Sequence, residues 1–134
     1  MSAPAGAGAP SPAAVLARGL LLPALAGALA VLGFAPFYAW PVPIFSLAIL
    51  FAVWDRSGSP LQACLSGFAF GLGLNLAGVS WVFVSLHYYG AMPAVLAAVA
   101  TFLFCALLAA FPALAGWALC RFSRQGALRL PVAA

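Results

Sequence analysis

The fold is decided by residues 57–120, which read SGSPLQACLSGFAFGLGLNLAGVSWVFVSLHYYGAMPAVLAAVATFLFCALLAAFPALAGWALC. This stretch, between Arg56 and Arg121, contains no charged side chain and is far longer than one membrane crossing requires, since a hydrocarbon core of about 30 Å takes about 20 apolar residues. Over the whole chain 67% of residues are apolar and 4% are charged. A soluble domain needs roughly a quarter of its residues charged. The sequence therefore predicts an all-α integral membrane protein.

Four apolar segments predict a membrane domain over residues 15–122, a bundle of about four transmembrane helices. The expected spans are 19–35, 41–54, 61–84 and 93–120. The second is short for a full crossing, so that tilting, local thinning of the bilayer or a re-entrant hairpin all remain open. Residues 1–14 are rich in Ala, Pro, Gly and Ser and are expected to be disordered. Residues 123–134 are expected to be a basic cytoplasmic tail or the start of a missing fifth span.

The first span has one alternative. Arg18 precedes a short apolar run, as the positive residue of a secretory signal peptide does. A mature polar domain should then follow, but residues 34–37 (FAPF) continue apolar. A first membrane helix is the better interpretation.

The arginines predict the orientation. With four spans, one side of the membrane carries all five, namely Arg18, Arg56, Arg121, Arg124 and Arg129. Because cytoplasmic loops of membrane proteins are enriched in Lys and Arg, both termini should be cytoplasmic. The turn at 37–40 and the loop expected at 85–92 should face outward.

The composition also limits the chemistry. The arginines are scattered at segment ends, so no basic face for nucleic acid is formed. Cys64, Cys105 and Cys120 lie in apolar runs without Cys-x-x-Cys spacing and are expected to be inert thiols. With Asp55 as the only acidic residue and His87 as the only histidine, no metal site, cofactor site or catalytic set is indicated.

Small residues in the third span predict close helix packing. Gly67 and Gly71 form a Gly-x-x-x-Gly pair, and Gly78 falls on the same side seven residues later. Such residues let a neighbouring helix approach closely in lipid, inside the chain or in a dimer. Asn75 is expected to hydrogen-bond across to a neighbouring helix.

An aromatic cluster marks the outward end of the same span. Trp81, His87, Tyr88 and Tyr89 lie in or beside the uncharged 85–92 loop. They could contact lipid headgroups or acyl chains, or face a further domain outside the membrane. The alternative is an interfacial aromatic belt without a specific ligand.

Several stretches, in matching order and separation, resemble bacterial apolipoprotein N-acyltransferases over roughly residues 15–130. They are GFAPF at 33–37 followed by WP at 40–41, GFAFGLG at 67–73, GVSWVFVSL at 78–86 and YGAMP at 89–93. The family usually has a second glycine where this chain has Ala91. A turn with positive φ at that position would therefore be strained here.

The resemblance implies an enzyme of the bacterial inner membrane. Its partners would be a phospholipid acyl donor, the N-terminal diacylglyceryl-cysteine of a lipoprotein that receives the acyl chain, and membrane lipids. The family is longer, with further spans and a nitrilase-like domain whose Glu-Lys-Cys triad forms a thioester. This chain has no Glu and no Lys, so no catalytic residue is expected in it. We expect it to be a membrane-anchoring part that is inactive alone.

Two other functional classes of membrane protein remain open for this sequence. A small multidrug-type antiporter can be built from four short spans, but proton coupling usually needs an ionisable residue within the membrane, and the third and fourth spans contain none. A non-catalytic membrane scaffold could use the Gly67 and Gly71 face.

Overall fold

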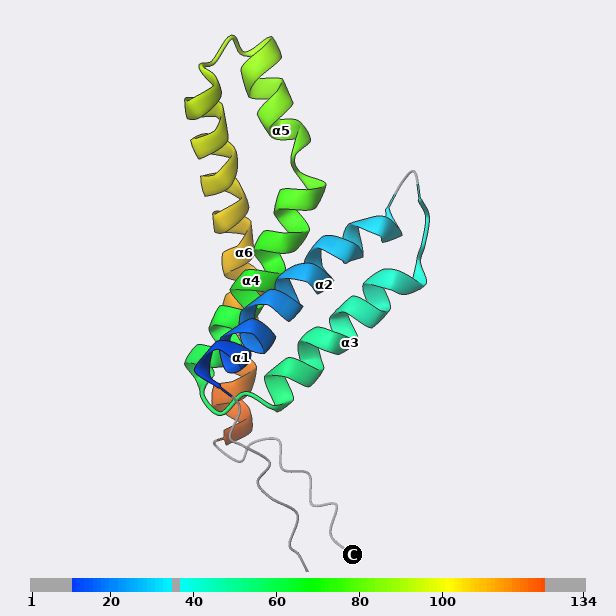
Figure 1. The fold of residues 1–134 in the computed structure, drawn as a ribbon, viewed down its shortest axis with the longest axis vertical. Coiled ribbons are helices and arrows are strands. Elements are labelled where there is room, and N and C mark those ends of the chain that lie inside the picture. Colours follow the sequence, from blue (N-terminus) through cyan, green and yellow to red (C-terminus); the bar gives the residue numbers. More distant parts are fainter. Residues whose placement is uncertain (1–10, 35–36, 125–134) are drawn as a thin grey trace, which may run out of the picture.

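The computed structural model describes residues 11–34 and 37–124 as helices joined by short turns (Figure 1). Within these residues there is no β-strand. The elements are α1 (Pro12–Leu16), the π-helical η1 (Ala17–Leu21), α2 (Leu22–Ala30), the 3-10 turn η2 (Val31–Gly33), α3 (Pro41–Asp55), α4 (Pro60–Gly78), α5 (Trp81–Val84), the π-helical η3 (Ser85–Tyr89) and α6 (Ala94–Arg124).

Three helices are long and apolar enough to cross a membrane. They cover Ala13–Gly33, Pro60–Gly78 and Ala94–Ser123. Helix α3 is also apolar, but its 15 residues extend only about 22 Å at 1.5 Å per residue. Its length is therefore below the hydrocarbon thickness of a typical bilayer.

Local sequence explains where two of these helices begin. Ser59 caps α4, because its Oγ accepts a hydrogen bond from the backbone N–H of Gln62 at 3.2 Å. Pro60 follows as the first helical residue, where its missing N–H is not needed. Pro41 occupies the equivalent place in α3.

Helix α4 is the centre of the fold, with α6 packed along one side and α2 across another, while α3 packs mainly on α2. The core cluster is Ala26, Leu50 and Phe70, with Trp54 and Leu74 against it. The turn at 56–59 and both ends of the described chain lie at one end of the molecule, and the turns near residues 37–40 and 90–93 lie at the other (Figure 1). The four main helical segments therefore alternate in direction.

The expected third span, 61–84, is not one continuous helix. Helix α4 ends at Gly78, where the N–H of Val79 donates to the carbonyl of Asn75 at 2.7 Å. A turn at Val79–Ser80 follows before helix resumes at Trp81. Nothing in the sequence at this point is charged, and no proline marks the break.

The prediction of a loop at 85–92 was wrong for most of that segment. Residues Ser85–Tyr89 are π-helical, and the N–H of Gly90 donates to the Ser85 carbonyl at 3.0 Å. Only residues 90–93 form a turn. Aromatic, uncharged composition suggested a loop, but in an apolar environment a backbone that bonds to itself in a helix is favoured over one left unpaired.

The structure describes only part of the two terminal segments predicted from the sequence. Of the tail expected at 1–14, residues 1–10 lie outside the described residues, and Pro12–Leu16 is helical. Ser11 caps this helix through a 3.3 Å bond from the Ala14 N–H to its Oγ. At the other end α6 continues to Arg124, and the rest of the segment 123–134 lies outside the described residues.

Candidate functional site

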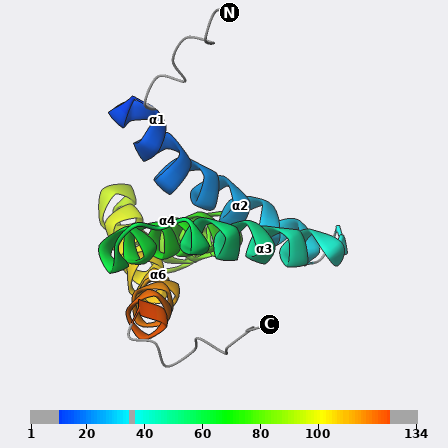
Figure 2. The same ribbon diagram turned by 90° about the horizontal axis from the view of Figure 1, so that it is seen from below.

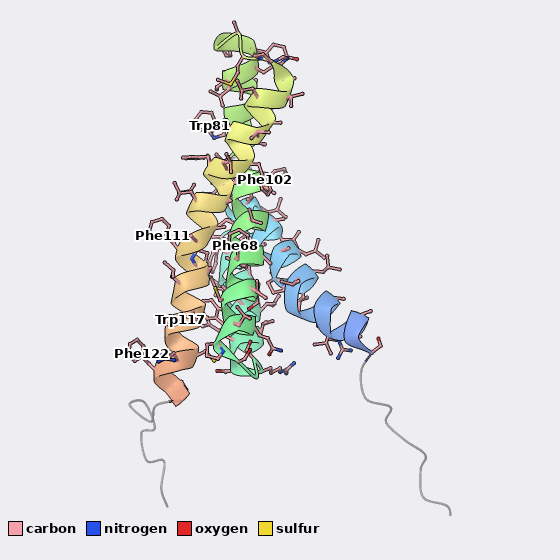
Figure 3. The ribbon with its side chains drawn as sticks, turned by 90° about the vertical axis from the view of Figure 1, so that its left-hand side faces the viewer. Phe68, Trp81, Phe102, Phe111, Trp117 and Phe122 are labelled. Carbon is pink, nitrogen blue, oxygen red and sulfur yellow. The ribbon has the colours of Figure 1, made fainter. Side chains whose placement is uncertain are left out.

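The most distinctive local structure is the tip of the helical hairpin formed by α5, η3 and the start of α6 (Figure 1). It reaches beyond the turn that joins the first long helix (Ala13–Gly33, comprising most of α1, then η1, α2 and η2, and called the first helix below) to α3. Trp81 begins the segment with 64% of its surface exposed, and Tyr88 and Tyr89 end it with 73% and 88% exposed. Trp81 and Phe111 project from the side of the hairpin away from the first helix (Figure 3).

His87 connects the two sides of the tip. Its Nδ1 atom lies 2.9 Å from the carbonyl oxygen of Met92. A carbonyl oxygen can only accept, so Nδ1 must carry the proton and donate. The imidazole stacks on Phe83 at a ring-centroid distance of 5.7 Å and meets Tyr88 edge-on at 5.0 Å. His87 is thus half-buried and held on three sides.

The turn closed by His87 has an unusual backbone. Ala91 has φ of 49°, in the left-handed region that costs an L-residue with a β-carbon roughly 1–2 kcal/mol. The sequence indicates that a positive φ would be strained at this position, and the structure has that positive φ. The next N–H, that of Met92, donates to the Leu86 carbonyl at 3.1 Å. A β-carbon on Gly90 would lie 2.7 Å from the same carbonyl oxygen, so the turn leaves no room there for a side chain.

A second aromatic turn lies at the same end of the molecule (Figure 1). Phe37, Tyr38 and Trp40 are 68%, 72% and 73% exposed, and Tyr38 also has a positive φ, of 51°. Exposed Tyr and Trp side chains gathered at one end of an apolar bundle are typical of a membrane–water interface. The arrangement is suited to contact with lipid headgroups.

Two of the three glycines singled out in α4 lie directly against α6. A β-carbon on Gly67 would overlap the carbonyl oxygen of Pro112 and lie 3.1 Å from the Cα of Ala113. One on Gly71 would lie 2.7 Å from the Cα of Ala109 and from the Cγ of Pro112. Gly78 differs, because its nearest neighbour would be Cγ2 of Val31 at an ordinary 3.5 Å. Only the first two are positions of close approach.

Asn75 does not make the interhelical hydrogen bond expected of it. Its Nδ2 donates at 2.8 Å to the carbonyl of Gly71 in the same helix. The carbonyl four residues earlier is the nearest acceptor for a short side chain in a helix. The side chain therefore satisfies its polar group locally.

Sequence reasoning missed the contacts between α4 and α2. A β-carbon on Gly27 would overlap the carbonyl oxygen of Phe70, and one on Gly73 would overlap that of Ala24. The sequence could have indicated the contact of Gly73. This residue lies two positions after Gly71, about 200° around the helix, so it must contact a different neighbouring helix. Gly116 was missed too, and a β-carbon there would lie 2.8 Å from the indole Nε1 of Trp54.

The sequence of this chain is similar to those of a known protein family. The sequence model described as the Apolipoprotein N-acyltransferase N-terminal domain matches residues 26–134. The chain belongs to the apolipoprotein N-acyltransferase family. The matched region includes α3, the whole α4–α6 hairpin and the tip around His87.

Curated relatives agree with this membership. The apolipoprotein N-acyltransferase of Nitrosomonas europaea is 54% identical over 91 residues, which is 68% of this chain and 18% of that protein. That of Methylococcus capsulatus is 52% identical over 101 residues, 75% of this chain and 20% of that protein. That of Pseudomonas syringae pv. tomato is 43% identical over 107 residues, 80% of this chain and 21% of that protein. The chain thus spans about a fifth of the length of these apolipoprotein N-acyltransferases.

Proposed function

We propose that this chain is the membrane-anchoring N-terminal part of an apolipoprotein N-acyltransferase. The complete enzyme would transfer an acyl chain from a phospholipid to the α-amine of the N-terminal diacylglyceryl-cysteine of a lipoprotein, at the bacterial cytoplasmic membrane. The observation that carries the proposal is the match of residues 26–134 to the N-terminal domain of this family. The three long apolar helices support the membrane location.

The part played by this chain would be positional. A thioester mechanism needs a base beside its nucleophile and a cation or other donor at the oxyanion, and the chain has no Glu or Lys to supply them. Cys105 is buried within α6, and Cys64 and Cys120 also lie in apolar helices. The chain alone should therefore transfer no acyl group.

The proposed topology has four spans with both termini in the cytoplasm. The alternating direction of the helical segments supports it, because α1, the 56–59 turn and the last turns of α6 lie at one end of the molecule (Figure 1). Arg18 directly follows α1, Arg56 begins that turn and Arg121 belongs to the last turns of α6. Helix α3 would cross with its ends drawn into the interface or with local thinning of the bilayer.

In this topology the two aromatic turns would face outward, where both lipid substrates would be anchored. Trp81, His87, Tyr88 and Tyr89 would lie beneath the catalytic domain, at headgroup level. Gly67 and Gly71 would keep α6 against α4 and thereby hold the tip at a fixed height. The tip would support the enzyme without taking part in the chemistry.

A chimera tests the proposal. In the Nitrosomonas europaea enzyme, the 91-residue region that aligns with this chain would be replaced by this chain's own residues. The assay would follow the mass gained by a diacylglyceryl-cysteine peptide incubated with phospholipid. We expect the chimera to be active, and the 134-residue chain alone to equal a blank without protein.

The control is the same chimera with Gly71→Leu, which should lose activity in proportion to its loss of folded protein. A chimera that accumulates in the membrane at the level of the parent enzyme but transfers no acyl chain would refute the platform role. An antiporter or a scaffold would then have to be considered again.

A further inference from the structure

An apolar groove runs between the first helix and α4. Its volume is about 390 Å³, and it is lined only by apolar residues, chiefly Leu20, Leu21, Leu65, Phe68, Leu72 and Leu76. Leu76 lies nine residues after Gly67, which is about two and a half helical turns. The groove is therefore on the face of α4 opposite to α6.

The groove exists because the two helices cross and then separate. They touch at backbone distance where Gly73 meets Ala24 and Gly27 meets Phe70. From this crossing the N-terminal half of the first helix moves away from α4 (Figures 2 and 3). The space left between them is bordered by Leu21 and Leu65, which stay 61% and 46% exposed. The glycine contacts thus fix the angle between the two helices, and no side chain of the described residues closes the groove between them.

The length and the apolar lining of the groove indicate its occupant. Along α4 it extends from Leu65 to Leu76, roughly 16 Å, which equals about half of a 30 Å hydrocarbon core. Water would find no polar partner there. A single extended acyl chain of one leaflet matches both the length and the chemistry.

Charge at the wide end selects among lipids. Arg18 belongs to η1, the same helical turn as Leu20 and Leu21, and its side chain is exposed. No ion pair is formed by Arg18 among the described residues, and the one acidic residue of the chain, Asp55, lies at the end of α3. A guanidinium at this position favours a phosphate that is not neutralised by its own headgroup.

We propose that this groove binds one acyl chain of an anionic phospholipid, with the lipid phosphate at Arg18. The lipid would lie in the leaflet that contains the chain termini, away from the two aromatic turns, and would brace the splayed half of the first helix against α4. The proposal requires only that the chain is inserted in a membrane, so it stands or falls independently of acyl transfer.

Native mass spectrometry of the purified chain tests this directly. The chain in mild detergent would be given equal concentrations of phosphatidylglycerol and phosphatidylcholine. We expect one lipid to be retained per chain, with phosphatidylglycerol preferred about five-fold, the preference that one basic residue near an anionic lipid supplies. Arg18→Gln should reduce this preference toward one-fold without removing all bound lipid.

Filling the groove should remove the lipid itself. Ala69→Phe places a ring inside the groove, and Leu65→Phe, at a half-exposed position on its border, offers a second variant that is easier to accommodate. Each should lower the bound fraction at least five-fold. The matched control is Ala115→Phe, on an exposed position of α6, which should bind as the parent chain does.

Equal binding by Ala69→Phe, Leu65→Phe and Ala115→Phe would overturn the proposal, as would equal retention of the two lipids by the parent chain. A lipid-free dimer that Leu65→Phe dissociates would also overturn it, because the occupant would then be a second copy of this chain.

Discussion

A β-carbon built on Gly71 of α4 would lie 2.7 Å from the Cγ atom of Pro112 in α6. Real side chains do not approach so closely, so these two helices meet at a distance that only glycine permits. In lipid, where water drives no association between helices, such close van der Waals contact is the main attraction. Gly67 extends the same contact toward Ala113, and together these residues define how α4 and α6 pack.

Substitution of Gly71 should therefore destabilise the protein. We expect Gly71→Ala to lower the free energy of unfolding by about 1–3 kcal/mol, the usual cost of overpacking. Gly78→Ala is the matched control, because its added methyl group would meet only Val31 at 3.5 Å. Thermal unfolding in the same detergent would compare them. Equal midpoints for both variants would mean that the two helices do not meet at Gly71.

Relief of the backbone strain at Ala91 should instead raise the free energy of unfolding. Because Ala91 has φ of 49°, we expect Ala91→Gly to stabilise the tip by about 1 kcal/mol. Ala98→Gly, at an exposed position within α6, should instead destabilise by about 0.5–1 kcal/mol. Chemical denaturation of both variants in detergent measures the difference. A destabilising Ala91→Gly would show that the turn does not have this backbone.

The hydrogen bond from His87 to Met92 can be separated from the ring stacking. His87→Phe keeps a ring against Phe83 but removes the donor, and should cost about 0.5–1.5 kcal/mol of local stability. His87→Asn places an amide N–H near the former Nδ1 position and should retain part of this local stability. Amide hydrogen exchange of residues 89–92 provides the measurement. If His87→Phe leaves exchange there unchanged, the ring alone holds the turn.

The sequence predicted the helical membrane class because that class depends on composition and on the length of apolar runs. It did not predict the break at Val79–Ser80 or the helix at Ser85–Tyr89. Neither proline nor charge marks these positions, and hydropathy alone does not distinguish a helical turn from a loop when both are apolar. At Ala91 the sequence indicated only that a positive φ would be strained, because the family usually has a glycine there and glycine has no β-carbon to clash.

Side-chain partners were harder to predict than helices. Asn75 was expected to bond to another helix, yet its own helix offers an acceptor at 2.8 Å. The contacts of Gly27 and Gly73 depend on how two helices cross, which a single helical period does not specify. The groove beside them depends on the same crossing angle, and so it could be found only in three dimensions.

In the proposed topology four segments cross the membrane, with the arginine-bearing end in the cytoplasm and the aromatic turns outside. Ser57→Cys and Tyr88→Cys, each in a chain whose three native cysteines are replaced by alanine, would be exposed to a membrane-impermeant thiol reagent in intact cells, with lysed cells as the control for reactivity. We predict labelling of Tyr88→Cys in intact cells and of Ser57→Cys only after lysis. Labelling of Ser57→Cys but not of Tyr88→Cys in intact cells would contradict the account.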